Sequence, residues 1–167
     1  IERLTEPVSE GNRSVTGSIR IFFQKIITTK LGGKFEYPLL AAVDLENSED
    51  FSNSSDSPEV VYVKDVEAVK ARVVQAKNIA IYIHGIFGDT ASMLPSLNSA
   101  VATLENDQTP IGQLYDLVLA FDYENLNTTI DRNARLRKER LEGVGLGAGH
   151  DKKIHMVAHS MGGLVSR

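Results

Sequence analysis

Hydrophobic residues in the second half of the chain form short continuous runs that alternate with segments of helical periodicity. Each run is bounded by polar or glycine-containing stretches, as is typical of strands that are covered on both faces. Three such strands are predicted, over 79–83, 117–121 and 154–158. Buried strands that alternate with amphipathic helices pair in parallel through right-handed crossovers. The pattern therefore predicts a doubly wound, mostly parallel α/β sheet.

Two segments between these strands carry the helical signal. The first, from Ser92 to Glu105, has its large apolar residues on one stripe: Leu94, Leu97, Val101 and Leu104. The second opens with Thr128–Asp131, which resembles a capping box, and continues as a highly charged helix to about Gly143. We expect both helices to connect neighbouring strands of the sheet.

The N-terminal part of the chain follows a different pattern. Two strand-like segments, Ser18–Ile27 and Lys34–Val43, are separated by a turn that contains Gly32 and Gly33, which favours an antiparallel hairpin. The segment 46–58 is polar, acidic and rich in serine. It lacks the apolar residues needed to offset its ordering entropy, so we expect a mobile loop there.

A short strand and a helix follow this loop. The strand is predicted at 60–63, and Asp65 is the expected cap of a helix with three valines at helical spacing: Val66, Val69 and Val73. We therefore divide the chain into an N-terminal region, 1–58, with the hairpin and the acidic loop, and an α/β region, 59–167.

Composition narrows the classes of function. The 167 residues carry 22 acidic and 18 basic side chains, a net charge of −4, with no basic tract of the kind that binds nucleic acid. The lack of cysteine excludes disulfides and thiolate metal sites. No apolar run approaches the roughly 20 residues of a membrane span, and no signal-peptide pattern opens the chain. Because the chain begins at Ile1, we expect it to be an excised piece, which leaves its compartment open.

The third buried strand ends in the most informative motif of the sequence, from Ala158 to Gly162. A serine at the tip of a sharp strand-to-helix turn is held above the sheet, where its hydroxyl can act as a nucleophile. Strand and helix crowd this turn, so the residues two before and two after Ser160 must be small, as Ala158 and Gly162 are. We expect Gly163 to let the helix lie close to the sheet. Met161 N–H is expected to point at a developing oxyanion.

A second motif, His84-Gly85, directly follows the first buried strand. In this position the backbone N–H of Ile86 is the expected second oxyanion donor, with Gly85 allowing the backbone to turn toward the site. We interpret His84 as packing beneath this loop and hydrogen-bonding the backbone rather than acting as the base.

Together the two motifs resemble those of serine lipases and esterases of the α/β-hydrolase fold. The form Ala-His-Ser-Met-Gly is similar to that of small bacterial lipases, and Ala158 stands where glycine is commoner. The resemblance covers about residues 78–167 and implies cleavage of acyl or lipid esters through an acyl-enzyme at Ser160. In this fold the acid and the histidine of the triad follow the serine. We therefore expect both beyond Arg167, with the fold truncated after the strand that carries the serine.

Other functions stay open at this point. The same fold supports acyl transfer and thioester hydrolysis, and the serine turn does not distinguish the acyl acceptor. A hydrolase-like region with an incomplete triad can also serve as a catalytically inactive binding module of a larger protein. For the isolated chain we expect negligible esterase activity, because Ser160 would lack a base.

The remaining chemistry-bearing residues receive structural interpretations. His159 is expected to shape the pocket, His155 to be a hydrogen-bonded core histidine, and His150 to lie in an exposed glycine-rich loop. Asp122, at the end of the second buried strand, is a candidate for a substrate- or loop-supporting role or for the triad acid. No group of residues has metal-ligand spacing, so we expect neither a metal nor a cofactor.

Strand 154–158 is expected to be a central strand of the complete sheet. Its next neighbour is absent from this sequence, so one apolar edge would be left with unpaired backbone groups. We expect self-association through this edge or pairing with the missing C-terminal half.

Overall fold

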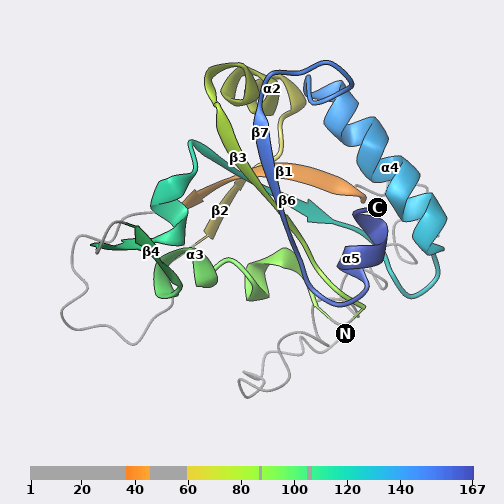
Figure 1. Cartoon of the computed structure of the whole chain (residues 1–167). Coiled ribbons are helices and arrows are strands. Elements are labelled where there is room, and N and C mark those ends of the chain that lie inside the picture. Colours follow the sequence, from red (N-terminus) through yellow and green to blue (C-terminus); the bar gives the residue numbers. More distant parts are fainter. Residues whose placement is uncertain (1–36, 46–59, 87, 105–106) are drawn as a thin grey trace, which may run out of the picture.

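The computed structural model describes residues 37–45, 60–86, 88–104 and 107–167. Its main element is a mixed sheet of five strands in the order β2-β1-β6-β3-β7 (Figure 1). The bounds of these strands are Leu39–Leu45 for β1, Val60–Val63 for β2, Asn78–Ile83 for β3, Leu117–Asp122 for β6 and Lys153–Ala158 for β7. β3 pairs in parallel with both β6 and β7, whereas β1 is antiparallel to β2 and to β6. The three predicted strands are confirmed as a parallel set within this mixed sheet. The predicted burial holds for β3 and β6 but is wrong for β7, which lies at the edge of the described sheet and has only exposed or half-buried residues.

Side chains of the parallel strands alternate between two packed cores. On β3, Ile79, Ile81 and Ile83 belong to the first core, whereas Ala80 and Tyr82 belong to the second. All five of these side chains are buried. An apolar residue at every position is what a strand with two covered faces requires, which explains the continuous run in the sequence.

Helices cover both faces of the sheet (Figure 1). The first core packs against α2, α4 and α5, and the second packs against α3. The bounds of these helices are Val66–Gln75 for α2, Ser96–Ser99 for α3, Ile130–Gly143 for α4 and Gly162–Val165 for α5. No helix in the described ranges is both long and apolar enough to span a membrane.

The two longest described helices begin at residues that cap them. Asp65 Oδ1 accepts a hydrogen bond from Ala68 N–H at 2.9 Å, which confirms Asp65 as the cap of α2. α4 begins at Ile130 and is capped by Thr129. The predicted capping box Thr128–Asp131 is therefore wrong by one residue, because the Thr128 hydroxyl bonds to the preceding turn instead.

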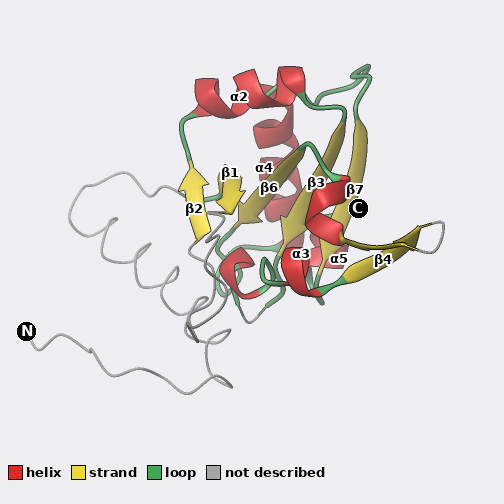
Figure 2. Ribbon diagram, turned by 90° about the vertical axis from the view of Figure 1, so that its left-hand side faces the viewer, coloured by secondary structure: helices red, strands yellow, loops and turns green. Residues whose placement is uncertain are grey.

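The predicted helix over 92–105 is wrong. After the short helix α3 the chain forms a hairpin of β4 (Val101–Leu104) and β5 (Asp107–Pro110), which extends away from the main sheet (Figure 2). The first two leucines of the stripe are buried, as a helix would require. The serine and asparagine residues of α3 are weak helix formers, however, and the β-branched residues that follow favour an extended chain.

Much of the N-terminal prediction lies outside the described residues. The first strand of the hairpin, Ser18–Ile27, and the loop 46–58 belong to that part. Of the second strand, Lys34–Val43, the described part begins at residue 37 and becomes β1 at Leu39. β1 lies between β2 and β6, so this segment contributes a strand to the interior of the main sheet.

The three parallel strands end side by side. Ile83, the last residue of β3, lies beside Phe121 of β6 and Ala158 of β7. The segments that follow these strands therefore leave the sheet at one edge, which we call the carboxyl edge. These segments include His84–Gly85, Tyr123–Asn125 and His159–Met161.

Candidate active site at the carboxyl edge

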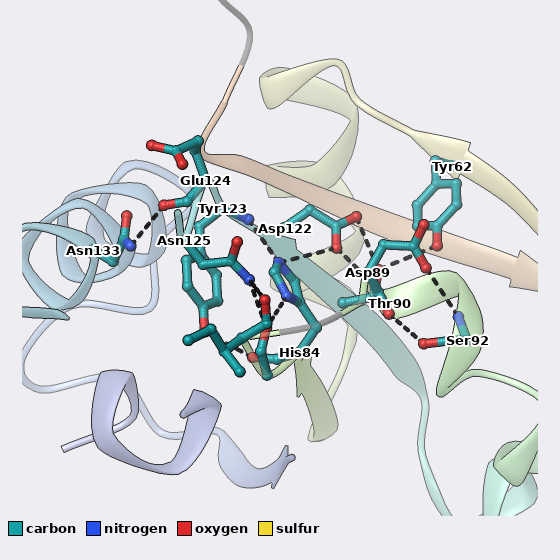
Figure 3. Close-up of polar contacts among 12 residues, drawn as sticks. Tyr62, His84, Asp89, Thr90, Ser92, Asp122, Tyr123, Glu124, Asn125 and Asn133 are labelled. Carbon is teal, nitrogen blue, oxygen red and sulfur yellow. Dashed lines mark hydrogen bonds and ion pairs between the residues drawn. The ribbon is translucent and has the colours of Figure 1, made fainter. Parts of the chain in front are cut away.

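The carboxyl edge holds all the buried polar side chains of the described part of the chain (Figure 3). Each of these side chains is 7% exposed or less: His84, Thr90, Asp122, Glu124, Asn125 and Asn133. They come from the segment after β3, from the last residue of β6 and the segment after it, and from the first turn of α4. Burial of polar groups costs free energy unless hydrogen bonds replace those to water. Their concentration at one edge therefore singles out that edge as the candidate site.

Ser160 occupies a strained turn between β7 and α5. Its φ is 52°, the only positive φ of a non-glycine residue in the described part of the chain. This left-handed conformation costs about 1–3 kcal/mol for a residue with a side chain, so surrounding contacts must impose it. Gly162 N–H donates to His159 O at 2.9 Å, and Gly163 N–H donates to Ser160 O at 3.0 Å. The predicted strand, sharp turn and helix are thus present, with the serine at the tip.

Two glycines bring this turn into contact with the end of β3. A methyl group on Gly162 would lie 2.5 Å from the carbonyl oxygen of Ile83. A methyl group on Gly85 would lie 2.8 Å from His159 Nδ1 and 3.0 Å from Ser160 Cβ. Neither position has room for a side chain unless its neighbours move, so the serine turn packs directly against the backbone of the loop after β3.

The prediction for Gly163 is wrong. Nothing lies within 4 Å of the position that a methyl group on Gly163 would take, so it is Gly162 that brings the helix close to the sheet. The helix turns the next residue away from the strands, which the spacing in the sequence does not reveal. Ala158, which precedes the turn, is exposed. The crowding therefore comes from the helical side of Ser160.

The reactive groups predicted at the turn are accessible. Ser160 is exposed, and its hydroxyl has no hydrogen-bond partner among the described residues. Within the same described ranges, the structure gives Met161 N–H no acceptor. The hydroxyl and the adjacent N–H are thus both available to a ligand at the carboxyl edge.

His84 is buried and held in one tautomer. Nδ1 donates to Gly85 O at 2.8 Å, and Nε2 accepts a hydrogen bond from Tyr123 N–H at 3.1 Å. A ring nitrogen that accepts an N–H carries no proton, so the imidazole is neutral. The ring also stacks on that of Tyr123, with 4.3 Å between centroids. Both ring nitrogens bond to the backbone, as predicted, and neither is free to serve Ser160 as a base.

The carbonyl groups of the loop after β3 are held by side chains that follow β6 (Figure 3). Tyr123 Oη donates to His84 O at 2.8 Å. Asn125 Nδ2 donates to Gly85 O at 2.8 Å and to Ile86 O at 2.7 Å. The C=O and N–H of a trans peptide point in opposite directions. Ile86 N–H, the predicted oxyanion donor, is therefore directed away from Asn125.

Glu124 organises the turn after β6. Its carboxylate accepts hydrogen bonds from the N–H groups of Leu126 and Asn127, both at 2.7 Å, and from Thr128 Oγ1 at 2.6 Å. Asn133 Nδ2, on α4, donates to Glu124 O at 2.9 Å. The turn is thereby fixed both to itself and to the helix that follows.

Asp122 supports the far end of the loop after β3. Its carboxylate accepts hydrogen bonds from Thr90 N–H at 2.8 Å and from Thr90 Oγ1 at 2.9 Å. Burial raises the pKa of Asp122. His84 Nε2 lies 3.8 Å from Asp122 Oδ1, but the imidazole is neutral, so the two do not form an ion pair. Of the two roles considered for Asp122, these contacts are those of a loop support.

The expectation for His155 is wrong. His155 is exposed on β7, and its ring meets that of Tyr115 edge-on, with 5.5 Å between centroids. β7 is the edge strand of the described sheet, and both of its faces are covered less than those of β3 and β6. Alternation along a strand predicts which residues share a face but not whether that face is covered.

His150 and His159 are exposed, as predicted for the first of them. His150 Nδ1 accepts a hydrogen bond from Lys152 N–H at 3.2 Å, in the loop that precedes β7. His159 N–H donates to Ile83 O at 3.1 Å, and its ring lies beside Gly85. No histidine of the chain hydrogen-bonds to the Ser160 hydroxyl in the described structure. The described residues also bring no three metal-ligating side chains together.

Four residues of the site have no role predicted from the sequence: Tyr123, Glu124, Asn125 and Asn133. The available signal was the polar run from Asp122 to Asn125, which directly follows an apolar strand. In open parallel sheets such strand ends are where ligands bind. The run marks the place but does not indicate that its side chains hold a loop from another strand.

Comparison with known proteins identifies a family. Searches of curated proteins and of solved structures found no match to the chain. The model of a family described as a domain of unknown function (DUF7379) matches residues 40–167. This range is most of the chain and contains the whole of the candidate site. The chain therefore belongs to the DUF7379 family.

Proposed function

We propose that this chain carries the nucleophile and the oxyanion hole of a serine hydrolase of the α/β-hydrolase type, acting on carboxylic esters with apolar acyl groups. The observation that carries the proposal is the left-handed conformation of Ser160, with φ at 52° between β7 and α5. A strained, exposed serine between a strand and a helix is the arrangement of a nucleophile elbow. Its position at the carboxyl ends of parallel strands supports the same proposal.

In the proposed reaction, Ser160 Oγ attacks the carbonyl carbon of the ester while a base accepts the hydroxyl proton. The carbonyl oxygen becomes an oxyanion, which the N–H groups of Ile86 and Met161 stabilise. The bond to the alcohol oxygen then breaks, the alcohol takes the proton from the base, and the acyl group stays on Ser160. Water that loses a proton to the same base releases the acid and restores the hydroxyl.

The proposal requires a base other than the histidines of this chain, because none of the four, His159 included, hydrogen-bonds to the Ser160 hydroxyl in the described structure. His84 is committed to the backbone through both nitrogens. His150 precedes β7, at the end of the strand opposite to Ser160, and His155 lies within that strand. In α/β-hydrolases the acid and the histidine follow the nucleophile along the chain. We therefore propose that both lie C-terminal to Ser160 in the full-length protein.

Exposed apolar side chains support an acyl substrate. Ile86 is 39% exposed, Leu126 is 44% exposed and Leu164 is 49% exposed. The three residues lie on the segments that follow β3, β6 and β7, all of which begin at the carboxyl edge. Large exposed apolar residues around a polar centre favour a ligand with a hydrocarbon portion. A fatty acyl or other lipid ester has this character.

The proposal is tested by reaction of the full-length protein with a fluorophosphonate probe, which labels activated serines. We expect one adduct, found by mass spectrometry on the peptide that contains Ser160, and no adduct in Ser160→Ala. Ser99→Ala is the matched control, because Ser99 is exposed on α3 and its hydroxyl bonds only to Pro95 O among the described residues. Folded protein without an adduct, or with the adduct on another serine, would contradict the proposal.

The isolated chain 1–167 offers a second test. Removing the base of a comparable triad lowers kcat by about 10⁶-fold, so we expect this chain to hydrolyse a short p-nitrophenyl ester no faster than Ser160→Ala does. Circular dichroism would establish that both samples are folded. Turnover that disappears in Ser160→Ala would mean that a residue of this chain acts as the base.

A further inference from the structure

We infer that Asn125 is a positioning residue, which fixes the direction of Ile86 N–H by holding two successive carbonyl groups of the loop after β3. This inference rests on the proposed function. An amide nitrogen has two hydrogens. Those of Asn125 are directed to Gly85 O at 2.8 Å and to Ile86 O at 2.7 Å. One buried side chain thus binds two neighbouring peptide units.

The hydrogen bonds from Asn125 set the direction of Ile86 N–H because a peptide unit is rigid. Gly85 O and Ile86 N–H belong to one planar trans unit, so rotation of that unit moves both groups together. While Asn125 holds the oxygen, the N–H stays on the opposite side of the unit. An oxyanion donor acts only if it already points at the place where charge develops.

Because residue 85 is a glycine, the peptide unit that follows it needs hydrogen bonds to restrain its orientation. The position of Gly85 has no room for a side chain, because a methyl group there would lie 2.8 Å from His159 Nδ1 and 3.0 Å from Ser160 Cβ. Glycine, however, has access to far more backbone conformations than any other residue. The peptide unit that carries the oxyanion donor thus begins at the residue whose backbone is least restrained. The hydrogen bonds of Asn125 supply the restraint that a side chain at this position would otherwise give.

Asn125 is itself held in place. It lies within the turn that Glu124 closes through hydrogen bonds from Leu126 N–H and Asn127 N–H. Asn133 ties the same turn to α4 through Glu124 O. The donor therefore stands on a support that is fixed before substrate arrives, which is the condition for electrostatic preorganisation.

Aspartate is the sharpest substitution because it has the shape of asparagine but, when ionised, no donor. In the variant Asn125→Asp, the ionised carboxylate would be an acceptor only, and the oxygen that replaces Nδ2 would face the two carbonyl oxygens. The variant should therefore turn the peptide unit away from its present orientation. Asn125→Ala removes the donors without this repulsion and leaves Gly85 O bonded to His84 Nδ1. We expect the same defect in Asn125→Ala, but a smaller one.

The test is the rate of fluorophosphonate labelling of the full-length protein over a range of probe concentrations. This separates the maximal inactivation rate, kinact, from the half-saturating concentration, KI. We expect Asn125→Asp to lower kinact about 100-fold, as when one oxyanion donor is removed, and to leave KI unchanged. Hydrogen exchange of the peptide that spans 84–88 should be faster in the same sample. Asn127→Asp is the matched control, because Asn127 is exposed and its side chain makes no hydrogen bond within the described structure.

Each outcome decides one question. If the wild type is not labelled at Ser160, the proposed function fails, and this inference fails with it. If the wild type is labelled at Ser160 and both Asn125 variants have the kinact of the wild type, only the inference about Asn125 is wrong, and the proposed function stands. A defect confined to KI, or a lower melting temperature with normal kinact in the folded protein, would also overturn it, because either result indicates a merely structural role.

Discussion

The two ends of the parallel strands use polar residues in opposite ways. The carboxyl edge has six buried polar side chains, which bond mostly to the backbone of neighbouring loops. At the opposite end, which we call the amino edge, polar contacts lie near the surface. There Asp116 accepts hydrogen bonds from Lys77 N–H and Asn78 N–H, both at 2.8 Å, and Asp44 pairs with Arg72.

The difference indicates what each edge is organised for. A buried polar group must recover the free energy of desolvation through its hydrogen bonds, so burial as such adds little net stability. A satisfied buried network does fix the directions of its members. The carboxyl edge thus has the properties of a site in which geometry matters, whereas the amino edge joins elements with contacts that stay hydrated.

The largest effect is expected for Gly162→Ala at the carboxyl edge. The added methyl group would lie 2.5 Å from Ile83 O and 2.6 Å from His84 O, which are backbone atoms that cannot move independently. Overpacking of this kind costs about 3 kcal/mol in free energy of unfolding, and the serine turn should be displaced. Urea unfolding measures the loss, and fluorophosphonate labelling of Ser160 reports on the turn.

Gly163→Ala is the neighbouring control for that substitution. Nothing lies within 4 Å of the added methyl group, and the residue is in α5. Alanine is a better helix former than glycine by up to about 1 kcal/mol, so we expect a small gain in stability and normal labelling. Equal losses in the two variants would mean that the close contact of Gly162 with β3 does not exist.

A smaller effect is expected for Tyr123→Phe, which removes one donor from the buried network. His84 O would lose the hydrogen bond that it now accepts at 2.8 Å from Tyr123 Oη. A buried acceptor left without its donor costs about 2 kcal/mol in free energy of unfolding. Tyr115→Phe is the control, because the Tyr115 hydroxyl has no hydrogen bond in the described structure, and we expect a change within about 0.5 kcal/mol. The free energy of unfolding of both variants is measured by urea unfolding. Equal losses in Tyr123→Phe and Tyr115→Phe would mean that the hydrogen bond to His84 O contributes no stability.

The parts of the site that could be predicted from the sequence are those fixed by local crowding. A serine in a strained turn requires a small residue two positions later, so Ser160 and Gly162 are recognisable together. Tyr123 and Asn125 were not predicted, because their partners lie 39 and 40 residues away in the chain. That distance is bridged only when β6 lies beside β3, and no local pattern contains the register of two parallel strands. The assignment to the α/β-hydrolase type stays a prediction.

The same limit separates the correct from the incorrect predictions of the fold. The three parallel strands could be predicted, because continuous apolar runs are typical of strands with two covered faces, although only β3 and β6 are buried. The prediction of a helix over 92–105 is wrong, because the spacing of Leu94 and Leu97 suits a single helical turn as well as a helix of four turns. His155 was misplaced because cover over β7 depends on its neighbours in space. Local patterns predict elements, and contacts between elements decide how far each extends and which face is buried.

The pH dependence of stability should have opposite signs at the two edges. Hydrogen bonds from the N–H groups of Asn78 and Lys77 hold the pKa of Asp116 below its ordinary value of 3.8. Its stabilisation is therefore present above pH 3.8 and is lost as the pH falls through the folded pKa. Burial raises the pKa of Asp122 above 3.8, so its contribution is present below that pH and is lost as the pH rises through the folded pKa.

Replacing Asp116 or Asp122 by asparagine removes the titrating carboxyl group. The difference in stability between variant and wild type then shows the direction in which that carboxyl group changes stability with pH. We expect the stability of Asp116→Asn relative to wild type to decrease as the pH rises, and that of Asp122→Asn to increase. Urea unfolding of both variants and the wild type, from about pH 3 to about pH 7, covers the range in which carboxyl groups titrate. If the stability of both variants relative to wild type changed in the same direction with pH, the predicted electrostatic difference between the two edges would be wrong.

The smallest effect is expected for Arg72→Ala at the amino edge. Arg72 Nη2 donates to Asp44 Oδ2 at 2.9 Å, and the hydrogen bonds of this pair hold the pKa of Asp44 below its ordinary value. The two side chains are 38% and 44% exposed, so water and salt screen the pair. We expect a loss of about 0.5 kcal/mol in free energy of unfolding, smaller still in high salt. Lys70→Ala on the same helix is the control, because Lys70 is exposed and has no ion pair in the described structure. A loss for Arg72→Ala that exceeds the loss for Tyr123→Phe would reverse the contrast, because the hydrated edge would then contribute more stability than the buried one.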